Sequence, residues 1–328
     1  MLAHETALLV KTSILEALAS GAVAPSFRER IETTLKKFPH PLHERTPLRP
    51  TQIALGAFFA GGGKQLQVGA KAAAATEVIV SASHVFDALA DHDRHSTNAD
   101  QQIGPALLFL ASHLFEASRA ASGLQVDWSQ VYSSFVTACS GQQADLDLQG
   151  NETPSLEEAK EMTEAKAGAI GKAIALAAGA STSVTSELAA FGLHFGTYSQ
   201  LLDDASDASI LSPGTSDIAL KKKTVPIAYF LHAKGDSPEL DACRSAFNAG
   251  GMDPTGEMQV RIAIETAGAI RFTLTLAHWY RMRAEAILER LEKHGCQTRL
   301  LRSLLEDKPK DPREPQANPP LTSPSSAV

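Results

Sequence analysis

Apolar residues recur along this chain with a helical spacing, and no stretch alternates apolar and polar residues as a half-buried strand does. Ala, Leu and Glu, which are good helix formers, dominate the periodic segments. The pattern therefore predicts an almost entirely helical protein. Helices are expected at about 5–19, 27–37, 51–59, 70–91, 103–121, 126–142, 155–178, 183–202, 217–232, 238–248, 256–294 (in two pieces) and 297–305.

Glycine and proline mark the boundaries between these segments, as at Gly61-Gly62-Gly63. Ser155, followed three residues later by Glu158, is typical of a helix start and is predicted to be a cap. From Lys308 onward the chain is rich in Pro and Ser and poor in aliphatic residues, which favours disorder. We therefore expect one all-α domain over residues 1–306 and a disordered tail over 307–328.

Composition narrows the range of functions. With 328 residues, 44% hydrophobic and 20% charged, the chain can bury one large core or two small ones. A net charge of −7, without a basic patch interleaved with aromatic residues, argues against nucleic acid as a partner. The three cysteines are far apart and match no metal or redox spacing, which fits a reducing compartment. The N-terminus has the pattern of an amphipathic helix rather than a signal peptide, and no later stretch is expected to span a membrane. These features predict a cytoplasmic protein without stable membrane insertion.

An aspartate cluster follows the apolar segment 191–202, with carboxylates at Asp203, Asp204 and Asp207. Carboxylates this close to an apolar helix face repel one another and are costly to remove from water. A cation must neutralise them, and hard oxygen ligands of this kind suit Mg²⁺. A second cluster, from Asp87 to Asp93, lies in an earlier helical segment. Two such clusters facing each other would hold several Mg²⁺ ions, an arrangement suited to binding a diphosphate.

Spacing within the clusters supports this interpretation. Asp87 and Asp91 lie four residues apart and share one face of a helix, and Asp203 and Asp207 repeat that spacing. Lys166 and Lys222 could meet the diphosphate oxygens that Mg²⁺ leaves free. Plainer interpretations stay open: Asp203 to Asp207 could be a solvated helix end, and Asp87 and Asp91 a solvated helix face. Lys166 could be a salt-bridge partner, and Asp145 could pair with a local cation.

Six segments occur in a fixed order. They are Gly62-Gly63-Lys64-Gln65-Leu66-Gln67, Asp87 to Asp91, Gly141-Gln142-Gln143-Ala144-Asp145, Lys166-Ala167, Gln200 with Asp203 to Asp207, and Asp217 to Pro226 with Lys221 in a glycine position. Together they resemble the motifs of the trans-isoprenyl diphosphate synthase (polyprenyl synthetase) family, which has the class I terpenoid synthase fold. The resemblance covers roughly residues 55–291.

The resemblance implies an all-α, single-domain bundle around a deep central cavity, acting as a homodimer on an allylic prenyl diphosphate with several Mg²⁺ ions. It assigns the metal ligands to Asp87, Asp91, Asp203 and Asp207, the diphosphate contacts to Lys64, Lys166, Gln200 and Lys222, and catalysis to Asp87, Asp91, Asp203, Lys166 and Lys222. The metals would stabilise diphosphate as a leaving group.

The chain departs from the family where the second substrate, isopentenyl diphosphate, would bind. Gln65 and Gln67 occupy arginine positions, and Val80 occupies a histidine position. An arginine pair is also missing near Ser96-Thr97, so that of the usual cations only Lys64 remains. Each charge-assisted bond replaced by a neutral one loses about 1 kcal/mol or more, which argues against ordinary chain elongation.

The first aspartate motif also departs from the family. Ala88 replaces its second aspartate, while the first and fifth positions, which face the metals in the family, are kept. We expect weakened rather than abolished metal binding. About one helical turn before Asp87, the residues are Ala82 and Ser83. Bulky side chains there limit product length in the family, so the small ones predict a long allylic tail unless Phe86 fills the space.

The favoured function is a Mg²⁺-dependent class I terpenoid synthase that ionises a prenyl diphosphate of geranylgeranyl size or longer, specifically a terpene synthase or cyclase. Alternatives are a polyprenyl diphosphate synthase, a prenyltransferase with another acceptor such as a peptide or an aromatic, and a non-catalytic partner subunit of an active homologue. The altered 64–67 segment and Ala88 favour the last of these, and the intact second aspartate motif opposes it.

Overall fold

The computed structural model describes residues 2–21, 23–37, 49–90, 101–148, 153–179, 184–209, 216–233 and 237–306. Every regular element in these ranges is helical, so the all-α prediction is confirmed. The elements are α1 (Leu2–Ser20), α2 (Pro25–Lys37), α3 (Arg49–Ala60), α4 (Leu66–Ala90), α5 (Ile103–Ser122), α6 (Trp128–Leu148), α7 (Leu156–Thr163), the π-helical segment η2 (Glu164–Gly168), α8 (Ala169–Gly179), α9 (Thr185–Asp207), α10 (Ser216–Ala219), α11 (Val225–His232), α12 (Pro238–Ala249), α13 (Pro254–Thr266), α14 (Ala269–Lys293) and α15 (Arg299–Glu306). The predicted disordered tail lies outside the described residues.

Two predicted boundaries are confirmed in detail. Ser155 caps α7 through a capping box, in which its hydroxyl accepts from the Glu158 amide and the Glu158 carboxylate accepts from the Ser155 amide at 2.7 Å. The long segment 256–294 divides into α13 and α14 because Gly268 takes a left-handed conformation, with φ at 79°.

One predicted helix, over 217–232, is wrong. The structure has two helices there, since α10 ends at Ala219 and α11 begins at Val225. Pro226 lies in the first turn of α11, a position where its missing amide hydrogen costs nothing. A continuous helix through this proline would have lost a backbone hydrogen bond, so the chain turns before it.

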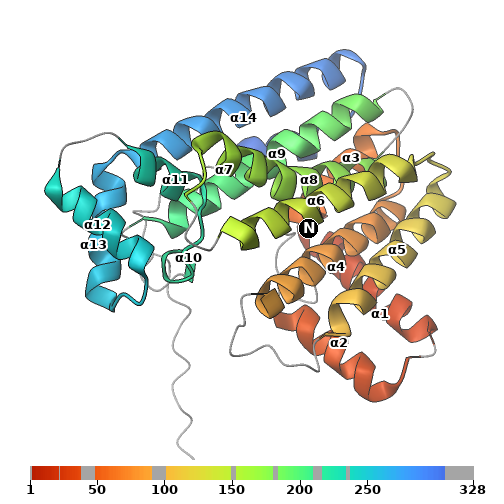
Figure 1. Ribbon diagram of the computed structural model, residues 1–328. Coiled ribbons are helices and arrows are strands. Elements are labelled where there is room, and N and C mark those ends of the chain that lie inside the picture. The colour runs from red at the N-terminus through yellow and green to blue at the C-terminus, as the bar shows by residue number, and fades with distance from the viewer. Residues whose placement is uncertain are drawn as a thin grey trace, which may run out of the picture.

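The bundle is built around α4, against which α1, α3, α5 and α8 pack. Helix α9 packs between α8 and α14, and Figure 1 shows α9 and α14 running side by side. A second, smaller apolar cluster joins the helices α10 to α13, with Ile227, Phe230 and Phe247 at its centre. In Figure 1 α12 and α13 lie at one end of the bundle, and α1 and α2 lie toward the other.

Helix α4 is the one helix in the described part of the chain that is long and apolar enough to cross a membrane. Its most apolar window is 61% buried inside the protein. The packing of four other helices around α4 accounts for this composition.

Glycines, which have no side chain, allow η2 and α8 to approach α9 closely. A Cβ on Gly171 would meet the carbonyl oxygen of Gly192, and a Cβ on Gly196 would meet that of Ala167. The close approach places η2, which contains Lys166, beside the C-terminal half of α9.

Candidate active site

The second aspartate motif forms the last turn of α9. Asp204 is buried, with 3% of its surface exposed, and accepts a hydrogen bond from Gln200 Nε2 at 2.7 Å. Asp203 is exposed and Asp207 is half-buried. A helix C-terminus carries negative partial charge, which disfavours carboxylates there. The turn therefore needs positive charge nearby.

Burial and mutual repulsion oppose ionisation of these three carboxyls. Burial raises the pKa of Asp204 well above its usual range, and the charges of Asp217 and Asp203 raise it further. The same causes, in the same order, raise the pKa of Asp207 to about 6. Although Asp203 has exposed surface, the surrounding protein removes enough hydration to raise its pKa as well, and Arg49 partly reverses this rise. Full ionisation of the cluster requires a cation.

Helix α10 and the turn after it add an acid, Asp217, and a base, Lys222, to this end of α9. Lys222 Nζ lies 3.7 Å from Asp217 Oδ1, and the Lys222 amide donates to the Asp217 carbonyl at 2.9 Å. The Lys222 charge also lowers the pKa of Asp207, so the two groups lie within electrostatic reach. In this turn Lys221 adopts φ of 55°, the left-handed conformation expected of the glycine it replaces.

Lys166 lies in η2, and its Nζ is 2.9 Å from Oδ2 of the buried Asp145 on α6. Helix α6 comes this close because a Cβ on Gly141 would meet the backbone of Ala165 and Lys166. The structure thus shows the salt bridge that the sequence left open. Lys166 also lowers the pKa of Asp204, so its ammonium group can act on the aspartate turn.

The π segment is anchored from the opposite side by α14. The hydroxyl of Tyr280, itself buried, donates to the carboxylate of Glu164, the first residue of η2. Burial and this hydrogen bond raise the pKa of Tyr280 above its ordinary value. Single π turns often occur at functional sites, and here the π turn carries Lys166.

Of the two aspartates of the first motif, Asp87 is the one that the structure describes. It lies half-buried near the end of α4, and Asp91 lies outside the described residues. Burial lowers the pKa of His84, the Asp87 charge opposes this, and the Lys166 charge adds to it. Asp87 and Lys166 therefore both lie within electrostatic reach of His84. This places the first motif near Lys166, which lies beside α9.

Lys64 lies elsewhere, at a cavity of about 430 Å³ between two loops. The cavity is lined by Gly61 to Lys64, by Val184 and by His294 to Gln297, among others, and none of the described aspartates of the two motifs lines it. Gln65 and Gln67 are exposed, and Val80 is half-buried. The structure does not bring Lys64 into contact with the aspartate turn.

The residues expected to set pocket depth lie on α4. Ala82 is fully buried in the main core, and Ser83 is half-buried, with its hydroxyl donating to the Val80 carbonyl at 2.8 Å. The Phe86 ring lies against Gly104 of α5 and is 38% exposed.

Two arginines of the site were not found from the sequence. Arg49 Nη1 lies 3.4 Å from Ser199 Oγ, and its charge lowers the raised pKa of Asp203. Arg261 is fully buried beneath the last turn of α9. Arg49 stands beside Pro50 at a helix start, and Arg261 stands four residues after Glu257, as in a surface salt bridge. Neither pattern distinguishes a site residue from an ordinary surface cation.

Comparison with known protein families identifies the chain. The model of the family described as Polyprenyl synthetase matches residues 47–249, which is more than half of the sequence. The chain belongs to the polyprenyl synthetase family. This membership makes it a relative of enzymes that act on prenyl diphosphates, as the motifs indicated. A search of curated protein sequences finds no significant match.

Solved structures of the family share the fold. A polyprenyl synthetase from Streptomyces coelicolor A3(2) is 22% identical with a TM-score of 0.70, covering 92% of this chain and 98% of its own. A geranylgeranyl pyrophosphate synthase from Corynebacterium glutamicum, complexed with isoprenyl diphosphate and magnesium, is 18% identical with a TM-score of 0.65, covering 93% and 99%. Heptaprenyl diphosphate synthase from Staphylococcus aureus is 15% identical with a TM-score of 0.68, covering 90% and 94%. At these identities the likeness shows the fold.

The residues at this site fit Mg²⁺ bound together with a diphosphate. In the described ranges no three His, Cys, Asp or Glu side chains are grouped so that they alone could hold a metal. Mg²⁺ is usually bound by one or two carboxylates plus substrate phosphates, so a three-residue cage is not required. The repelling carboxylates at the end of α9 supply hard oxygen donors that only a cation would fully ionise.

Proposed function

We propose that this member of the polyprenyl synthetase family is a Mg²⁺-dependent enzyme that ionises a long allylic prenyl diphosphate, acting as a terpene synthase or cyclase. The observation that carries the proposal is the aspartate turn of α9, which lies within electrostatic reach of Arg49, Lys166 and Lys222. The carboxylates can bind a metal ion and the cationic side chains can donate to phosphate oxygens. Together they suit a diphosphate that is bound both through metal ions and by direct hydrogen bonds.

Each group has a distinct part in this reaction. Asp87, Asp91, Asp203 and Asp207 would hold Mg²⁺, which when bound supplies the positive charge that stabilises a departing diphosphate. Lys166 and Lys222 would donate to diphosphate oxygens, drawing on ammonium groups now paired with Asp145 and Asp217. Gln200 fixes the orientation of Asp204.

The loss of most of the usual cations at the acceptor position, where only Lys64 remains, supports a reaction without isopentenyl diphosphate. Gln65 and Gln67 are neutral and exposed, and the side chain of Val80 has no hydrogen-bond donor. A second diphosphate in this place would lose several charge-assisted contacts, each about 1 kcal/mol or more. The carbocation left after ionisation would then react within its own chain or with water.

The proposed tail length, geranylgeranyl-sized or longer, rests on the small side chains of Ala82 and Ser83. It also rests on Phe86, whose ring packs toward α5.

A chain-elongating prenyltransferase is the second candidate, because a specific observation favours it. Lys64 lines a cavity of about 430 Å³, a volume sufficient for a small second substrate. The family resemblance places an isopentenyl diphosphate lysine at this position. A prenyltransferase with another acceptor would use the same space.

Product analysis by mass spectrometry separates these candidates. Purified protein and Mg²⁺ are incubated with geranyl, farnesyl, geranylgeranyl or geranylfarnesyl diphosphate, each with and without isopentenyl diphosphate. Hydrocarbon or alcohol released without isopentenyl diphosphate supports the terpene synthase. Longer diphosphates formed only with isopentenyl diphosphate contradict it and support elongation. No turnover in any mixture favours another acceptor or a non-catalytic partner subunit.

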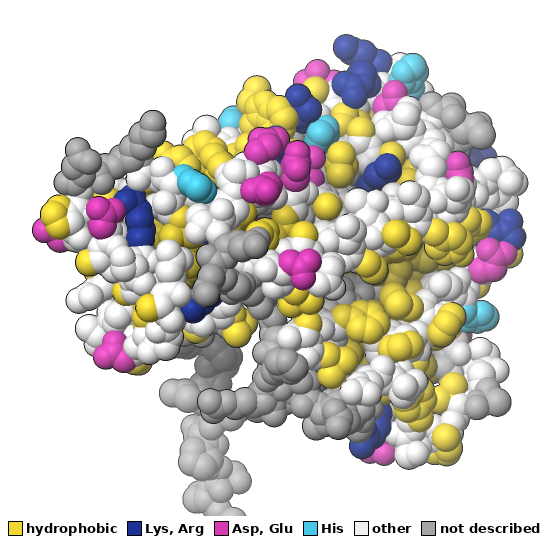
Figure 2. Space-filling view, in the orientation of Figure 1, with side chains coloured by type: hydrophobic (Ala, Val, Ile, Leu, Met, Phe, Trp, Pro, Cys, Tyr) yellow, Lys and Arg dark blue, Asp and Glu magenta, His cyan; other side chains and the backbone are white. Residues whose placement is uncertain are grey.

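We also propose a homodimer, for which the surface of α5 and α6 offers support. The exposed fractions there are 41% for Leu108, 76% for Phe109, 55% for Tyr132 and 69% for Val136. Figure 2 shows hydrophobic side chains gathered over these helices. From residue 129 to 143 the exposed positions of α6 carry no charge, which is unusual for a solvated helix face. The three cysteines are free, in keeping with a cytoplasmic location.

A further inference from the structure

Arg261 of α13 is fully buried, although it carries a charge that cannot be removed at ordinary pH. Its Nη1 donates to the main-chain carbonyl of Asp207 and, at 2.9 Å, to that of Ser209. The Asp207 carbonyl belongs to the last turn of α9, where the helix has no further amides for it, and the Ser209 carbonyl follows two residues later. The guanidinium group is therefore a side-chain cap on the aspartate turn.

The rest of the guanidinium is bound on its own helix. Nε and Nη2 of Arg261 donate to Glu257 Oε1 at 3.1 Å and 2.6 Å. This ion pair balances the buried charge and fixes the plane of the fork. With both ends bound, Arg261 connects α13 rigidly to the last turn of α9.

The contact lies at the turn that presents the carboxylates. Asp207 contributes its carbonyl to Arg261 and its carboxyl to the site, and Asp203 lies one helical turn earlier. If the last turn frays, the two carboxyls lose their common orientation, because only continuous helix keeps residues four apart on one face. The charge of Arg261 also offsets the negative end of the helix.

We propose that Arg261 is a positioning residue, which fixes the last turn of α9 so that Asp203 and Asp207 bind a divalent cation together with a diphosphate. The inference rests on the function proposed above, since it assumes that this turn binds metal. Arg261 itself touches neither metal nor substrate.

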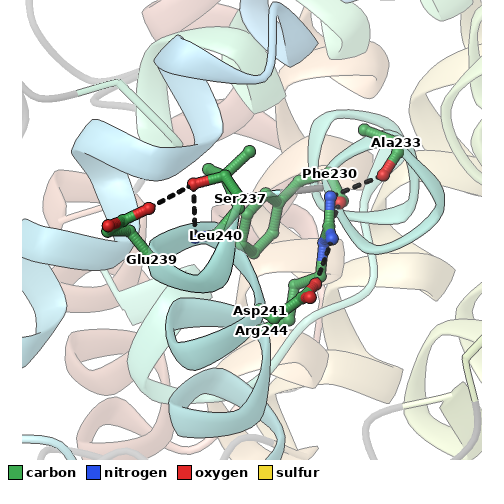
Figure 3. A network of polar contacts seen from close by, with 7 residues as sticks. All are labelled: Phe230, Ala233, Ser237, Glu239, Leu240, Asp241 and Arg244. Carbon is green, nitrogen blue, oxygen red and sulfur yellow. Dashed lines mark hydrogen bonds and ion pairs between the residues drawn. The ribbon is translucent and has the colours of Figure 1, made fainter. Parts of the chain in front are cut away.

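Arg244 of α12 provides a matched control. Its Nε and Nη2 donate to the carbonyls of Phe230 and Ala233 at the end of α11, at 3.0 Å and 2.5 Å. Its Nη1 donates to Asp241 at 2.7 Å on its own helix. Figure 3 shows this network. Arg244 therefore caps a helix as Arg261 does, but that helix carries no aspartate motif.

The test measures Mn²⁺ binding by electron paramagnetic resonance in the presence of inorganic diphosphate, with the melting temperature as a separate measure of folding. Arg261→Met is expected to weaken Mn²⁺ affinity about tenfold, since two carbonyls lose a charged donor. Arg244→Met is expected to lower the melting temperature and leave Mn²⁺ affinity unchanged. Arg261→Lys keeps the charge without the fork and is expected to give an intermediate loss.

Unchanged Mn²⁺ affinity in a folded Arg261→Met protein would overturn the inference and leave Arg261 as a structural cap. If that variant does not fold, Arg261→Lys decides, and wild-type affinity in it also overturns the inference. Failure of the wild-type protein to bind Mn²⁺ with diphosphate would overturn the proposed function itself, and the positioning role with it. The two failures are thus told apart by the wild-type measurement.

Discussion

Glu77 lies inside α4 with no exposed surface. One oxygen of its carboxyl accepts from the amide of Thr51 at 2.8 Å and from the hydroxyl at 2.5 Å. The other oxygen is buried without a hydrogen-bond partner among the described residues. Burial raises the pKa of Glu77 to about 7, and the two bonds from Thr51 lower it only in part. Burial therefore favours the protonated form of Glu77 in the folded protein, although the two bonds from Thr51 favour the carboxylate.

The raised pKa of Glu77 predicts that stability falls as pH rises. Between pH 4.5 and about 7 the unfolded chain has lost this proton and the folded chain keeps it, so each step up in pH favours unfolding. Glu77→Gln should remove this dependence. The unfolding free energy of the variant relative to wild type should therefore rise by roughly 3 kcal/mol from pH 4.5 to pH 8. Urea denaturation at the two pH values measures it. The exposed carboxyl of Glu289 gives the control Glu289→Gln; an equal difference at both pH values for Glu77→Gln would contradict the prediction.

Asp203 gives the second residue-scale prediction. Asp203→Asn removes a carboxylate from the aspartate turn while keeping its shape, so diphosphate release should fall by at least about a hundredfold if the residue holds metal. Phosphate-release assays with geranylgeranyl diphosphate measure the change. Asp147→Asn, at an exposed position of α6, should retain activity. Full activity in Asp203→Asn would remove this residue from the proposed metal site.

At the scale of elements, the site depends on close approaches that only small or special residues permit. Gly141 lets α6 touch η2, and the salt bridge between Asp145 and Lys166 follows one turn later. The turn after α10 depends on the left-handed backbone of Lys221, whose Nζ donates to the Asn248 carbonyl at 2.7 Å. In both places the backbone determines where a lysine of the site lies.

Gly141→Ala should displace η2 and with it Lys166, because the new Cβ would overlap the backbone of that segment. We expect a loss of about 1–3 kcal/mol in unfolding free energy and a lower kcat. Urea denaturation and steady-state kinetics measure the two effects. Ser140→Ala, at the exposed neighbouring position, should change neither. Wild-type kinetics in a folded Gly141→Ala protein would show that the position of Lys166 does not depend on this contact.

Two substitutions at Lys221 isolate the cost of its backbone conformation. Lys221→Gly and Lys221→Val both remove the bond to Asn248, but only valine keeps a Cβ at φ of 55°, and it adds a branch there. The valine variant should be less stable than the glycine variant by about 1–2 kcal/mol. Thermal or urea denaturation gives the difference directly. Equal stabilities would mean that the turn relaxes away from the left-handed conformation.

At the scale of the whole molecule, the apolar surface of α5 and α6 stands apart, because the exposed positions of α6 from residue 129 to 143 carry no charge. Its largest exposed side chains, Phe109 and Val136, belong to neither the main core nor the aspartate site. A chain with 20% charged residues has enough charge to cover such a face, so its absence there favours a covered surface.

Phe109→Asp combined with Val136→Asp should convert the proposed dimer to a monomer, because two buried charges per subunit would oppose association. Analytical ultracentrifugation over a range of concentrations measures the change. Met282→Asp on α14, where the wild-type side chain is 55% exposed, should leave association unchanged. A monomeric wild-type protein would contradict the proposed dimer, and an unaffected double variant would place the interface elsewhere.

Sequence and structure agree best where the deciding interaction is local. The capping box at Ser155, the break at Gly268 and the helical nature of every described element follow from residues within a few positions of one another. The wrong prediction, a single helix over 217–232, also has a local cause. The lysines at 221–223 fit a helix as well as a turn, so the periodic pattern alone does not show the break. The signal for the break is Pro226, which lies in the first turn of α11.

The sequence by itself determined the all-α class, the family and the identity of the aspartate motifs, because these depend on periodicity and on spacing along one helix. Only the tertiary structure showed that Lys166 is paired with Asp145, that Lys64 lines a separate cavity, and that two arginines reach the end of α9. Arg49 and Arg261 come from helices far from α9 in the chain. Their positions follow from how α3 and α13 pack, and helix packing depends on the shapes of many side chains at once rather than on any local pattern.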